Sequence, residues 1–311
     1  MSSRPRILVV YKKTTYQRYR GGSSERLTKL LAENDVSVEN LVEEHESHLE
    51  TLERTRAVLE RLGADATFEH DHQPTSAGPW DLVVTVGGDG TLLWNSHAVG
   101  ADTKMVAINS APKTSVGYFC AGRRENVEET LTAALEGRLK ATRLSRMQVQ
   151  IDGEIVSKRI LNDILFSHSC PAAASKYVLR VGDVEESQLS SGIWAGPAAG
   201  STAAQRSAGG RVLPIGSRKI QWVVREPYHG LEERFALVRG VIGPGEAIVI
   251  KSKMREGVIY LDGANRVIPV DIGSVITLEE SNEPLHLLGL ERRHREHPHR
   301  AALARDPLID S

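Results

Sequence analysis

A short run of aliphatic and β-branched residues at positions 82–86 leads directly into Gly87-Gly88-Asp89-Gly90-Thr91. A continuous apolar run of this length, bounded by turn residues, predicts a strand that is buried on both faces of a parallel sheet. The glycines let the chain turn tightly where the strand ends, and the next residues, Leu92-Leu93-Trp94, are compatible with a helix. A strand, a glycine turn and a helix in this order indicate an α/β domain with a ligand site at the turn.

Strand-like and helix-like segments alternate around this motif. Apolar runs at residues 7–11 and 104–109 predict two further strands, and apolar residues recur at mostly helical spacing between residues 39 and 62. Gly63 follows the last of them, in the position where a helix commonly ends. The alternation predicts an N-terminal open α/β domain over residues 1–138.

The pattern changes after residue 140. Residues 147–151 alternate between apolar and polar, Asp152-Gly153 is typical of a hairpin turn, and further strand-like segments occur at residues 220–224 and 235–241. We therefore expect a C-terminal β-rich, β-sandwich-like domain over residues 139–280, followed by a tail at residues 281–311. The end of this tail is crowded with arginine and histidine, which we interpret as solvated surface.

The composition disfavours several classes of function. The 311 residues include 39 Lys and Arg against 40 Asp and Glu, a net charge of −1, which provides no broad attraction for nucleic acid or an anionic membrane. Cys120 and Cys170 are far apart and have no closely spaced Cys or His partners, which disfavours a disulfide scaffold or a zinc site. The apolar runs are shorter than a signal sequence or a membrane span requires. We expect a cytoplasmic protein without a nucleic-acid or membrane partner.

The residues of the glycine motif favour phosphoryl transfer. Backbone amides at the start of the following helix favour phosphate oxygens, and glycines allow those oxygens to approach the backbone. Asp89 adds a carboxylate beside them, which is useful if it holds Mg²⁺ or accepts a proton from an attacking hydroxyl. The alternative is that Asp89 only closes an Asx turn. The motif contains neither the Lys-Ser/Thr pair of a P-loop nor a Gly-x-Gly-x-x-Gly turn.

Two clusters in the second half of the chain are further candidates for a ligand site. Asn162 and Asp163 interrupt an otherwise apolar strand-like run, and such residues are costly inside a sheet unless they are paired. Asp163 is a candidate acceptor for ribose hydroxyls, and a turn at the end of a strand is the alternative. Residues 191–210 are mostly small and would let a flat ligand lie close to the backbone; alternatively, Ser201 or Thr202 caps an ordinary short helix.

Together these clusters resemble the NAD kinase family, which phosphorylates the 2′-hydroxyl of the adenosine ribose of NAD. The order and the spacing of the family's motifs match this sequence over residues 5–280. The matching segments are Gly87 to Thr91, Asn109 with the loop to Gly117, Asn162-Asp163, Gly200 to Ala204, and Ser207 to Gly210.

The sequence departs from the family's pattern at several positions. Ala204 stands in place of a tyrosine, Ser191 in place of an aspartate and Asp163 in place of a glutamate, and the loop after Asn109 is longer. The missing aromatic ring at Ala204 removes an expected stacking surface for a base. Ser191-Gly192, the long loop and Arg225-Glu226-Pro227 resemble the divergent, catalytic branch of the family that includes the mitochondrial NAD kinases of animals.

The resemblance implies a role for each motif. Asp89 would orient or deprotonate the ribose hydroxyl and would help to hold Mg²⁺ or another divalent cation, with ATP or polyphosphate as the phosphoryl donor. The implied nucleotide-binding residues are Gly88, Gly90, Thr91, Asn162, Asp163, Ser201, Thr202, Ala203 and Ser207. We also expect a homo-oligomer, a dimer or a tetramer. Two rival functions remain open: a lipid or sphingoid kinase that shares the glycine motif, and a non-catalytic dinucleotide-binding regulator.

Overall fold

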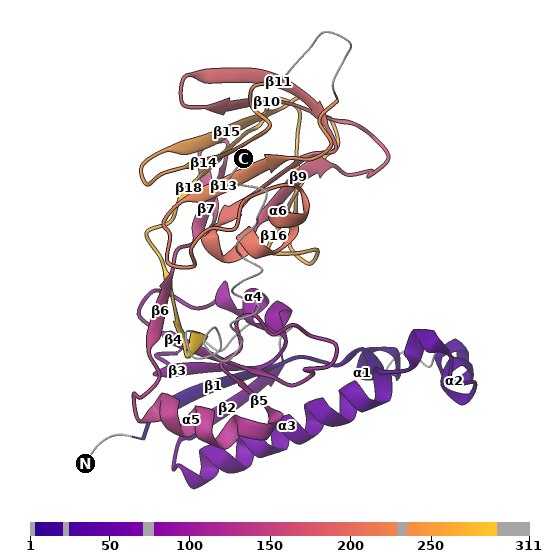
Figure 1. The fold of residues 1–311 in the computed structure, drawn as a ribbon, viewed down its shortest axis with the longest axis vertical. Helices are drawn as coiled ribbons and strands as arrows, with labels where there is room; N and C mark the ends of the chain where they lie inside the picture. Colours follow the sequence, from indigo (N-terminus) through magenta and orange to yellow (C-terminus); the bar gives the residue numbers. More distant parts are fainter. Residues whose placement is uncertain (1–3, 21–24, 71–77, 229–234, 291–311) are drawn as a thin grey trace, which may run out of the picture. The chain divides into compact units, whose positions relative to one another are not determined.

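The computed structural model describes residues 4–20, 25–70, 78–228 and 235–290 (Figure 1). Contacts between Cα atoms divide these residues into two compact units. The first unit contains the described residues up to 142 together with residues 286–290, and the second contains those from 143 to 285. Each unit has its own hydrophobic core, so each is described separately.

The first unit is built on one mainly parallel sheet. Its strands are β1 (Arg6–Tyr11), β2 (Asp65–His70), β3 (Leu82–Gly87), β4 (Lys104–Asn109), β5 (Gly122–Arg123), β6 (Ala141–Leu144) and β19 (Leu285–Leu288). Their order is β2-β1-β3-β4-β19-β6, and β5 also pairs with β4. Strands β1, β3 and β4 pair in parallel, so their carboxyl ends meet at the same edge. Every residue of β3 is buried, as its uninterrupted apolar run predicts.

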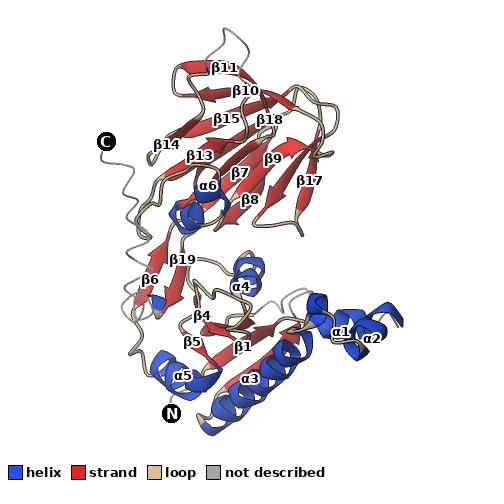
Figure 2. Cartoon of the chain, turned by 45° about the vertical axis from the view of Figure 1, so that its right-hand side comes forward, coloured by secondary structure: helices blue, strands red, loops and turns tan. Residues whose placement is uncertain are grey.

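Helices cover both faces of this sheet. The helical segments are α1 (Thr15–Arg20), α2 (Glu25–Ala32), η1 (Val36–Val38), α3 (Leu41–Arg61), α4 (Asp89–Ser96), η2 (Arg124–Asn126) and α5 (Val127–Leu135). Figure 2 shows α3 and α5 on one face of the sheet and α4 on the other. The face of α3 that carries Leu52 and Leu59 packs into the core, and the helix ends before Gly63, whose φ of 70° suits a residue without a Cβ.

The second unit is a sandwich of two antiparallel sheets. Its elements are β7 (Met147–Ile151), β8 (Glu154–Ile160), β9 (Ile164–His168), β10 (Ser175–Val181), β11 (Val184–Ser190), β12 (Ile193–Pro197), η3 (Ala198–Thr202), α6 (Ala204–Ser207), β13 (Ile220–Val224), β14 (Arg239–Ile242), β15 (Ala247–Ser252), β16 (Gly257–Leu261), β17 (Val267–Val270) and β18 (Val275–Glu280). One sheet has the order β11-β10-β15-β18-β7-β8 and the other β14-β13-β12-β9-β16-β17. Side chains from both sheets form one core, in which Phe166 meets Tyr177 edge to face at 5.8 Å between ring centroids.

The predicted fold class, an α/β domain followed by a β-sandwich-like domain, is therefore confirmed. Three details differ from the expectation. Residues 161–163 connect β8 to β9 and are not part of a strand, and β14 begins at Arg239, later than the apolar pattern at residue 235 indicated. Strand β19 lies inside the expected tail, because His286 and Leu287 pair with β4 and the leucines of the strand are buried. Residues 291–311 of the tail lie outside the described residues.

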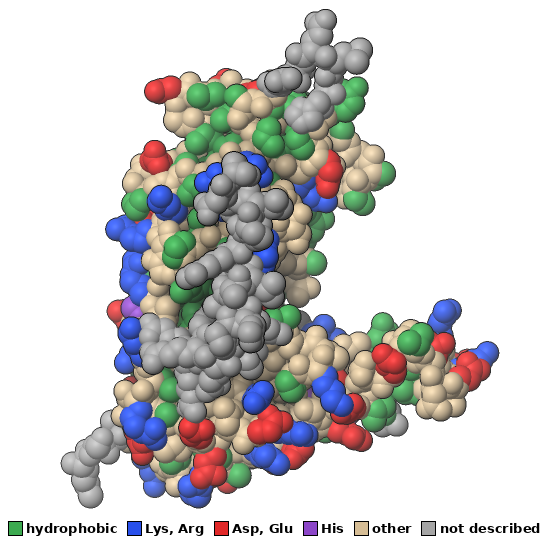
Figure 3. All heavy atoms as spheres, viewed as in Figure 1, with side chains coloured by type: hydrophobic (Ala, Val, Ile, Leu, Met, Phe, Trp, Pro, Cys, Tyr) green, Lys and Arg blue, Asp and Glu red, His purple; other side chains and the backbone are tan. Residues whose placement is uncertain are grey.

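The surface is consistent with the balanced composition. In Figure 3, acidic and basic side chains are interspersed on the visible face of the first unit. Among the described residues, none of the helices has the length and apolar character needed to cross a membrane.

Candidate functional site

The glycine motif lies at the carboxyl end of β3, where its packing explains two of its three glycines. A Cβ atom on Gly87 would overlap Oγ1 of Thr91, and one on Gly88 would overlap Oγ of Ser115. Neither glycine has a positive φ, so close packing and not an unusual backbone conformation favours them, most strongly at Gly87, where Cβ of Thr91 is also in the way. A Cβ atom on Gly90 would have nothing within 4 Å. Only Gly90 therefore leaves open space beside the backbone for a ligand.

Asp89, in the first turn of α4, has a fixed and half-buried carboxylate. Its Oδ2 accepts a hydrogen bond from the Tyr118 amide at 2.8 Å, and its Oδ1 accepts one from the Phe119 amide at 2.9 Å. These partners lie far along the chain, so the carboxylate holds a distant loop and does not close the local Asx turn considered above. A carboxylate can accept about four hydrogen bonds, so both oxygens keep acceptor capacity for a hydroxyl or a metal ion.

In the second unit, Asp262 organises the segment that carries Asn162 and Asp163. Its carboxylate accepts hydrogen bonds from three consecutive amides, those of Leu161 at 2.9 Å, Asn162 at 2.7 Å and Asp163 at 3.1 Å. Asp262 precedes Gly263, a pair typical of turns, and the φ of 49° at Asp262 agrees with a turn. The role of the Asp262 side chain was missed, because its partners are about a hundred residues away in the sequence.

Asp163 has an unusual environment for a carboxyl group. It is 4% exposed, and this burial, reinforced by the nearby charge of Asp262, raises its pKa to about 7. Its Oδ2 accepts a hydrogen bond from the side-chain amide of Asn162 at 3.1 Å. Asp163 also lines a pocket of about 230 Å³ whose other lining residues are Leu165, Trp194, Tyr260, Gly263 and Ala264. A buried carboxyl with a perturbed pKa beside an aromatic-lined pocket is typical of a binding site.

Small residues at the end of β12 and directly after it pack against the backbone of Asn162. Cβ atoms on Gly196 or Gly200 would overlap the carbonyl oxygen of Asn162, and Nε2 of Gln205 donates to the same oxygen at 3.5 Å. The structure thus brings the Asn162-Asp163 pair and this small-residue segment together. The packing of the chain upon itself explains Gly196 and Gly200 without a ligand.

The remaining candidates of this segment differ in exposure. Ser201 is fully buried: its hydroxyl donates to the carbonyl of Ala198 at 2.7 Å and accepts from the amide of Leu213 at 2.9 Å, a structural role that the sequence did not indicate. Thr202 and Ala203 are half-buried and Ser207 is exposed. Neither Ser201 nor Thr202 caps α6, whose N-cap residue is Ala203. Gly88, Asp89, Gly90 and Thr91 belong to the first unit and the other candidates to the second.

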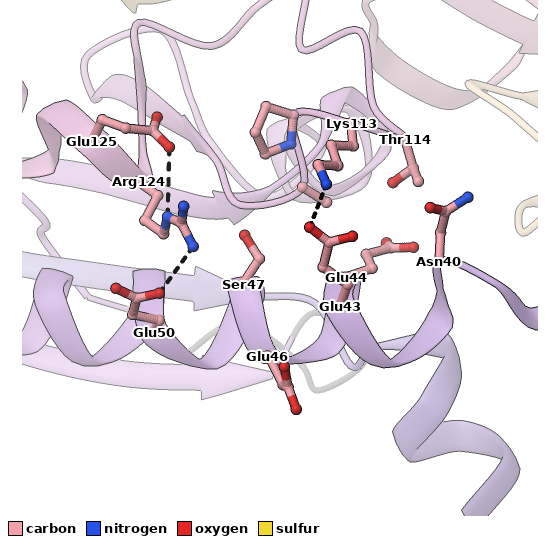
Figure 4. A pocket seen from close by; sticks show the side chains of 12 residues that line it. Asn40, Glu43, Glu44, Glu46, Ser47, Glu50, Lys113, Thr114, Arg124 and Glu125 are labelled. Carbon is pink, nitrogen blue, oxygen red and sulfur yellow. Dashed lines mark hydrogen bonds and ion pairs between the residues drawn. The ribbon is translucent and has the colours of Figure 1, made fainter. Parts of the chain in front are cut away.

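A second pocket, of about 250 Å³, lies in the first unit between α3 and the residues at 111–114 and 124–125 (Figure 4). Five glutamates line it, whereas its two cations are both engaged: Lys113 pairs with Glu43, and Arg124 with Glu50 and Glu125. This excess of negative charge repels phosphate groups, so the pocket does not suit a nucleotide. The described residues include no group of three or more His, Cys, Asp or Glu arranged to hold a metal ion.

An α/β unit that presents a half-buried carboxylate at a glycine turn, followed by an antiparallel sandwich, suits a nucleotide-dependent phosphotransferase. Residues 13–139 match the model of the ATP-NAD kinase N-terminal domain. A probable NADH kinase from Oryza sativa subsp. japonica is 34% identical over 258 residues, which cover 76% of this chain and 79% of that protein. The NADH kinase of Arabidopsis thaliana is 32% identical over 67% of this chain and 72% of its own length.

The fold agrees with these matches. The crystal structure of an NAD kinase from Archaeoglobus fulgidus, solved in complex with ATP, superimposes with a TM-score of 0.69. It is 22% identical, and the match covers 97% of this chain and all of that chain. The chain belongs to the NAD kinase family.

Proposed function

We propose that this protein transfers the γ-phosphoryl group of ATP to the 2′-hydroxyl of the adenosine ribose of NAD or NADH. The observation that carries the proposal is the extended similarity to the NADH kinase of rice, 34% identity over 76% of the chain. The fixed carboxylate of Asp89 at the end of β3 supports it independently, because it stands where a parallel sheet commonly binds ligands.

In the proposed reaction, Asp89 accepts the proton of the ribose hydroxyl while the hydroxyl oxygen attacks the γ-phosphorus atom. The bond from this phosphorus to the β-γ bridging oxygen breaks, and ADP leaves. Two amides fix the Asp89 carboxylate, so little reorganisation is needed when the hydroxyl arrives. Gly90 would let a phosphate approach the backbone, since no other atom occupies the space beside it. Gly88 and Thr91 would support the turn through their packing.

On the acceptor side, Asp163 would accept a hydrogen bond from a ribose hydroxyl, and Asn162 would hold the Asp163 carboxyl in place. The pocket beside Asp163 includes Trp194 and Tyr260, whose rings can pack against a base or a sugar. Thr202, Ala203 and Ser207 are retained as contacts of the dinucleotide. Ser201 would act only by fixing the backbone that carries them.

A divalent cation fits this scheme as a companion of ATP. Mg²⁺ usually keeps several waters and is bound by one or two carboxylates together with substrate phosphates, so it does not need a cluster of protein ligands. Asp89, with acceptor capacity on both carboxylate oxygens, is the residue that would contact it. When bound, the cation would neutralise charge on the transferred phosphoryl group.

Cytoplasmic location and a homo-oligomeric state remain parts of the proposal. The chain has only two cysteines, Cys120 and Cys170, which are far apart in the sequence, and this usage supports a reducing compartment. Fractionation of cells and light scattering of the purified protein test these two points.

The function is tested by incubating the purified protein with ATP and Mg²⁺ and with NAD, NADH, diacylglycerol or sphingosine as the acceptor. We expect NADP or NADPH, with phosphorus NMR placing the new phosphate on the adenosine ribose. Phosphorylation of a lipid without phosphorylation of NAD or NADH would support the rival lipid kinase. Binding of NAD without turnover with any donor, including polyphosphate, would support the regulator.

A further inference from the structure

His48 is a buried polar side chain to which the proposed reaction assigns no role. It lies on α3, on the far side of the sheet from α4, and is 1% exposed. Burying an imidazole is costly unless both ring nitrogens find partners. The partners of His48 therefore indicate what the side chain stabilises.

The imidazole connects two strand ends that flank β3. Its Nδ1 lies 2.8 Å from Oγ of Ser110, the residue that follows β4, and the backbone of Lys12, the residue that follows β1, interacts with the ring. The neighbouring Ser47 donates from its hydroxyl to the carbonyl of Ser110 at 2.9 Å. Two consecutive residues of α3 thus hold Ser110.

The two residues that His48 contacts in turn hold the end of β3. The amide of Lys12 donates to the carbonyl of Val86 at 3.2 Å, and the amide of Ser110 donates to the carbonyl of Gly87 at 3.0 Å. Val86 and Gly87 are the last two residues of β3, and Gly88 and Asp89 follow directly. His48 is therefore connected to the end of β3, just before Asp89, on both sides: through Lys12 on the β1 side and through Ser110 on the β4 side.

Ser110 also begins the loop that grips the Asp89 carboxylate. Asn109 fixes this loop internally, since its Nδ2 donates to the carbonyl of Ser115 at 3.1 Å and its Oδ1 accepts from the amide of Ala111 at 3.1 Å. The loop ends at Tyr118 and Phe119, whose amides bind the two oxygens of Asp89. Both the backbone and the side chain of Asp89 thus depend on the position of Ser110.

We propose that His48, assisted by Ser47, is a positioning residue that sets the orientation of Asp89 through Lys12, Ser110 and the loop at residues 110–119. This inference rests on the proposed function, in which Asp89 reacts with the ribose hydroxyl. A neutral imidazole offers one donor and one acceptor, which match a backbone carbonyl at Lys12 and the hydroxyl of Ser110. Burial, together with the charges of Lys12 and His45, lowers the pKa of His48 to about 4, so the neutral form predominates at neutral pH.

The test compares His48→Ala, His48→Asn and Ser47→Ala with the control Thr55→Val. Thr55 is a buried polar residue of the same helix whose hydroxyl bonds only within the helix, to the carbonyl of Thr51 at 2.8 Å. In His48→Asn the side-chain carbonyl can replace Nδ1 as the acceptor for Ser110. We expect kcat to fall by about 10- to 100-fold in His48→Ala, since small misplacements of a reacting group cost that much, while KM changes little. His48→Asn should recover most of this loss, and Ser47→Ala should show a smaller decrease.

A second readout does not depend on activity. Hydrogen exchange at the amides of Tyr118 and Phe119 should become faster in His48→Ala and Ser47→Ala, and should stay at the wild-type rate in Thr55→Val at a matched free energy of unfolding. Unchanged exchange at both amides, or equal losses of kcat in His48→Ala and Thr55→Val, overturns the inference. If His48→Ala does not fold, kcat and the exchange rates of the same two amides in Ser47→Ala decide whether the inference holds. Wild-type protein that phosphorylates neither NAD nor NADH refutes the proposed function instead, and the exchange experiment still decides whether His48 positions Asp89.

Discussion

The substitution Asp163→Asn tests how much stability the protein loses by burying a carboxyl group that ionises. The pKa of Asp163 rises from 3.8 to about 7 in the folded protein, chiefly because the group is buried and secondarily because Asp262 lies nearby. Between these two values the folded state therefore binds more protons at this position than the unfolded state. It follows that the contribution of Asp163 to the free energy of unfolding decreases as the pH rises from 4 to 7.

The magnitude follows from the difference between the two pKa values. One pKa unit corresponds to 1.36 kcal/mol, so a difference of about 3 amounts to roughly 4 kcal/mol of stability lost between pH 4 and pH 8. An asparagine cannot ionise and occupies nearly the same volume. The free energy of unfolding of Asp163→Asn minus that of the wild type should therefore increase by about 4 kcal/mol over this range.

The assay is urea unfolding at several pH values, monitored by tryptophan fluorescence, to which Trp194 and Trp222 of the second unit contribute. His48 contributes in the opposite direction, since its pKa is lowered to about 4, but it is present in both proteins and cancels in the difference. Asp183→Asn, at an exposed turn between β10 and β11, is the matched control and should follow the wild type. If the difference in free energy of unfolding between Asp163→Asn and the wild type changes by less than about 1 kcal/mol from pH 4 to pH 8, burial does not raise the pKa of Asp163 as inferred.

A second variant, Asp163→Ala, tests the binding role, because alanine has no side-chain oxygen that could accept a hydrogen bond. If Asp163 accepts a hydrogen bond from the ribose in both the ground state and the transition state, KM for NAD should rise and kcat should change little. Loss of a hydrogen bond to a charged group costs about 1.5 to 3 kcal/mol, which corresponds to a rise in KM of about 10- to 150-fold in Asp163→Ala. An Asp163→Ala enzyme with wild-type KM for NAD and NADH would show that the buried carboxyl does not bind the dinucleotide.

Three further substitutions test the glycine motif and the segment after β12. Asp89→Asn should lower kcat by about 10²- to 10⁴-fold with little change in KM for NAD, and a wild-type kcat would end the proposed mechanism. Gly90→Ala should leave the melting temperature unchanged or slightly raised, because its Cβ meets no atom within 4 Å, yet it should raise KM for ATP; unchanged kinetics would mean that no phosphate approaches there. Gly200→Ala should prevent folding or greatly lower the melting temperature, because its Cβ overlaps the carbonyl oxygen of Asn162, and a normally stable variant would contradict this packing.

The sequence predicted those features that depend on neighbouring residues. The apolar run of β3 is buried along its whole length, and the helix before Gly63 ends where a residue with positive φ is needed. Asp152-Gly153 forms the predicted hairpin turn, with φ values of 52° and 85°. Such features follow from local periodicity and turn chemistry, which a single sequence contains.

The sequence did not predict the contacts that organise the candidate site. Asp262 caps amides about a hundred residues earlier in the chain, and His48 binds Ser110 across 62 residues. Each of these residues has an ordinary local context: Asp262 precedes a glycine in a turn, and His48 lies in an amphipathic helix. Their roles depend on which strand ends become neighbours, and local patterns do not specify that.

The structure also separates residues that folding explains from residues that it does not. Packing accounts for Gly87, Gly88 and Gly200, because a side chain at any of these positions would overlap a neighbouring atom. Gly90 has no such neighbour, although alanine is the better helix former at an exposed position near the start of α4. Asp163 lowers the stability of the folded protein at neutral pH, because its buried carboxyl is then partly ionised, and an asparagine would not have this effect. At both positions another residue would make the folded protein more stable, so stability does not explain the residue that is present. We therefore expect Gly90 and Asp163 to contact substrate.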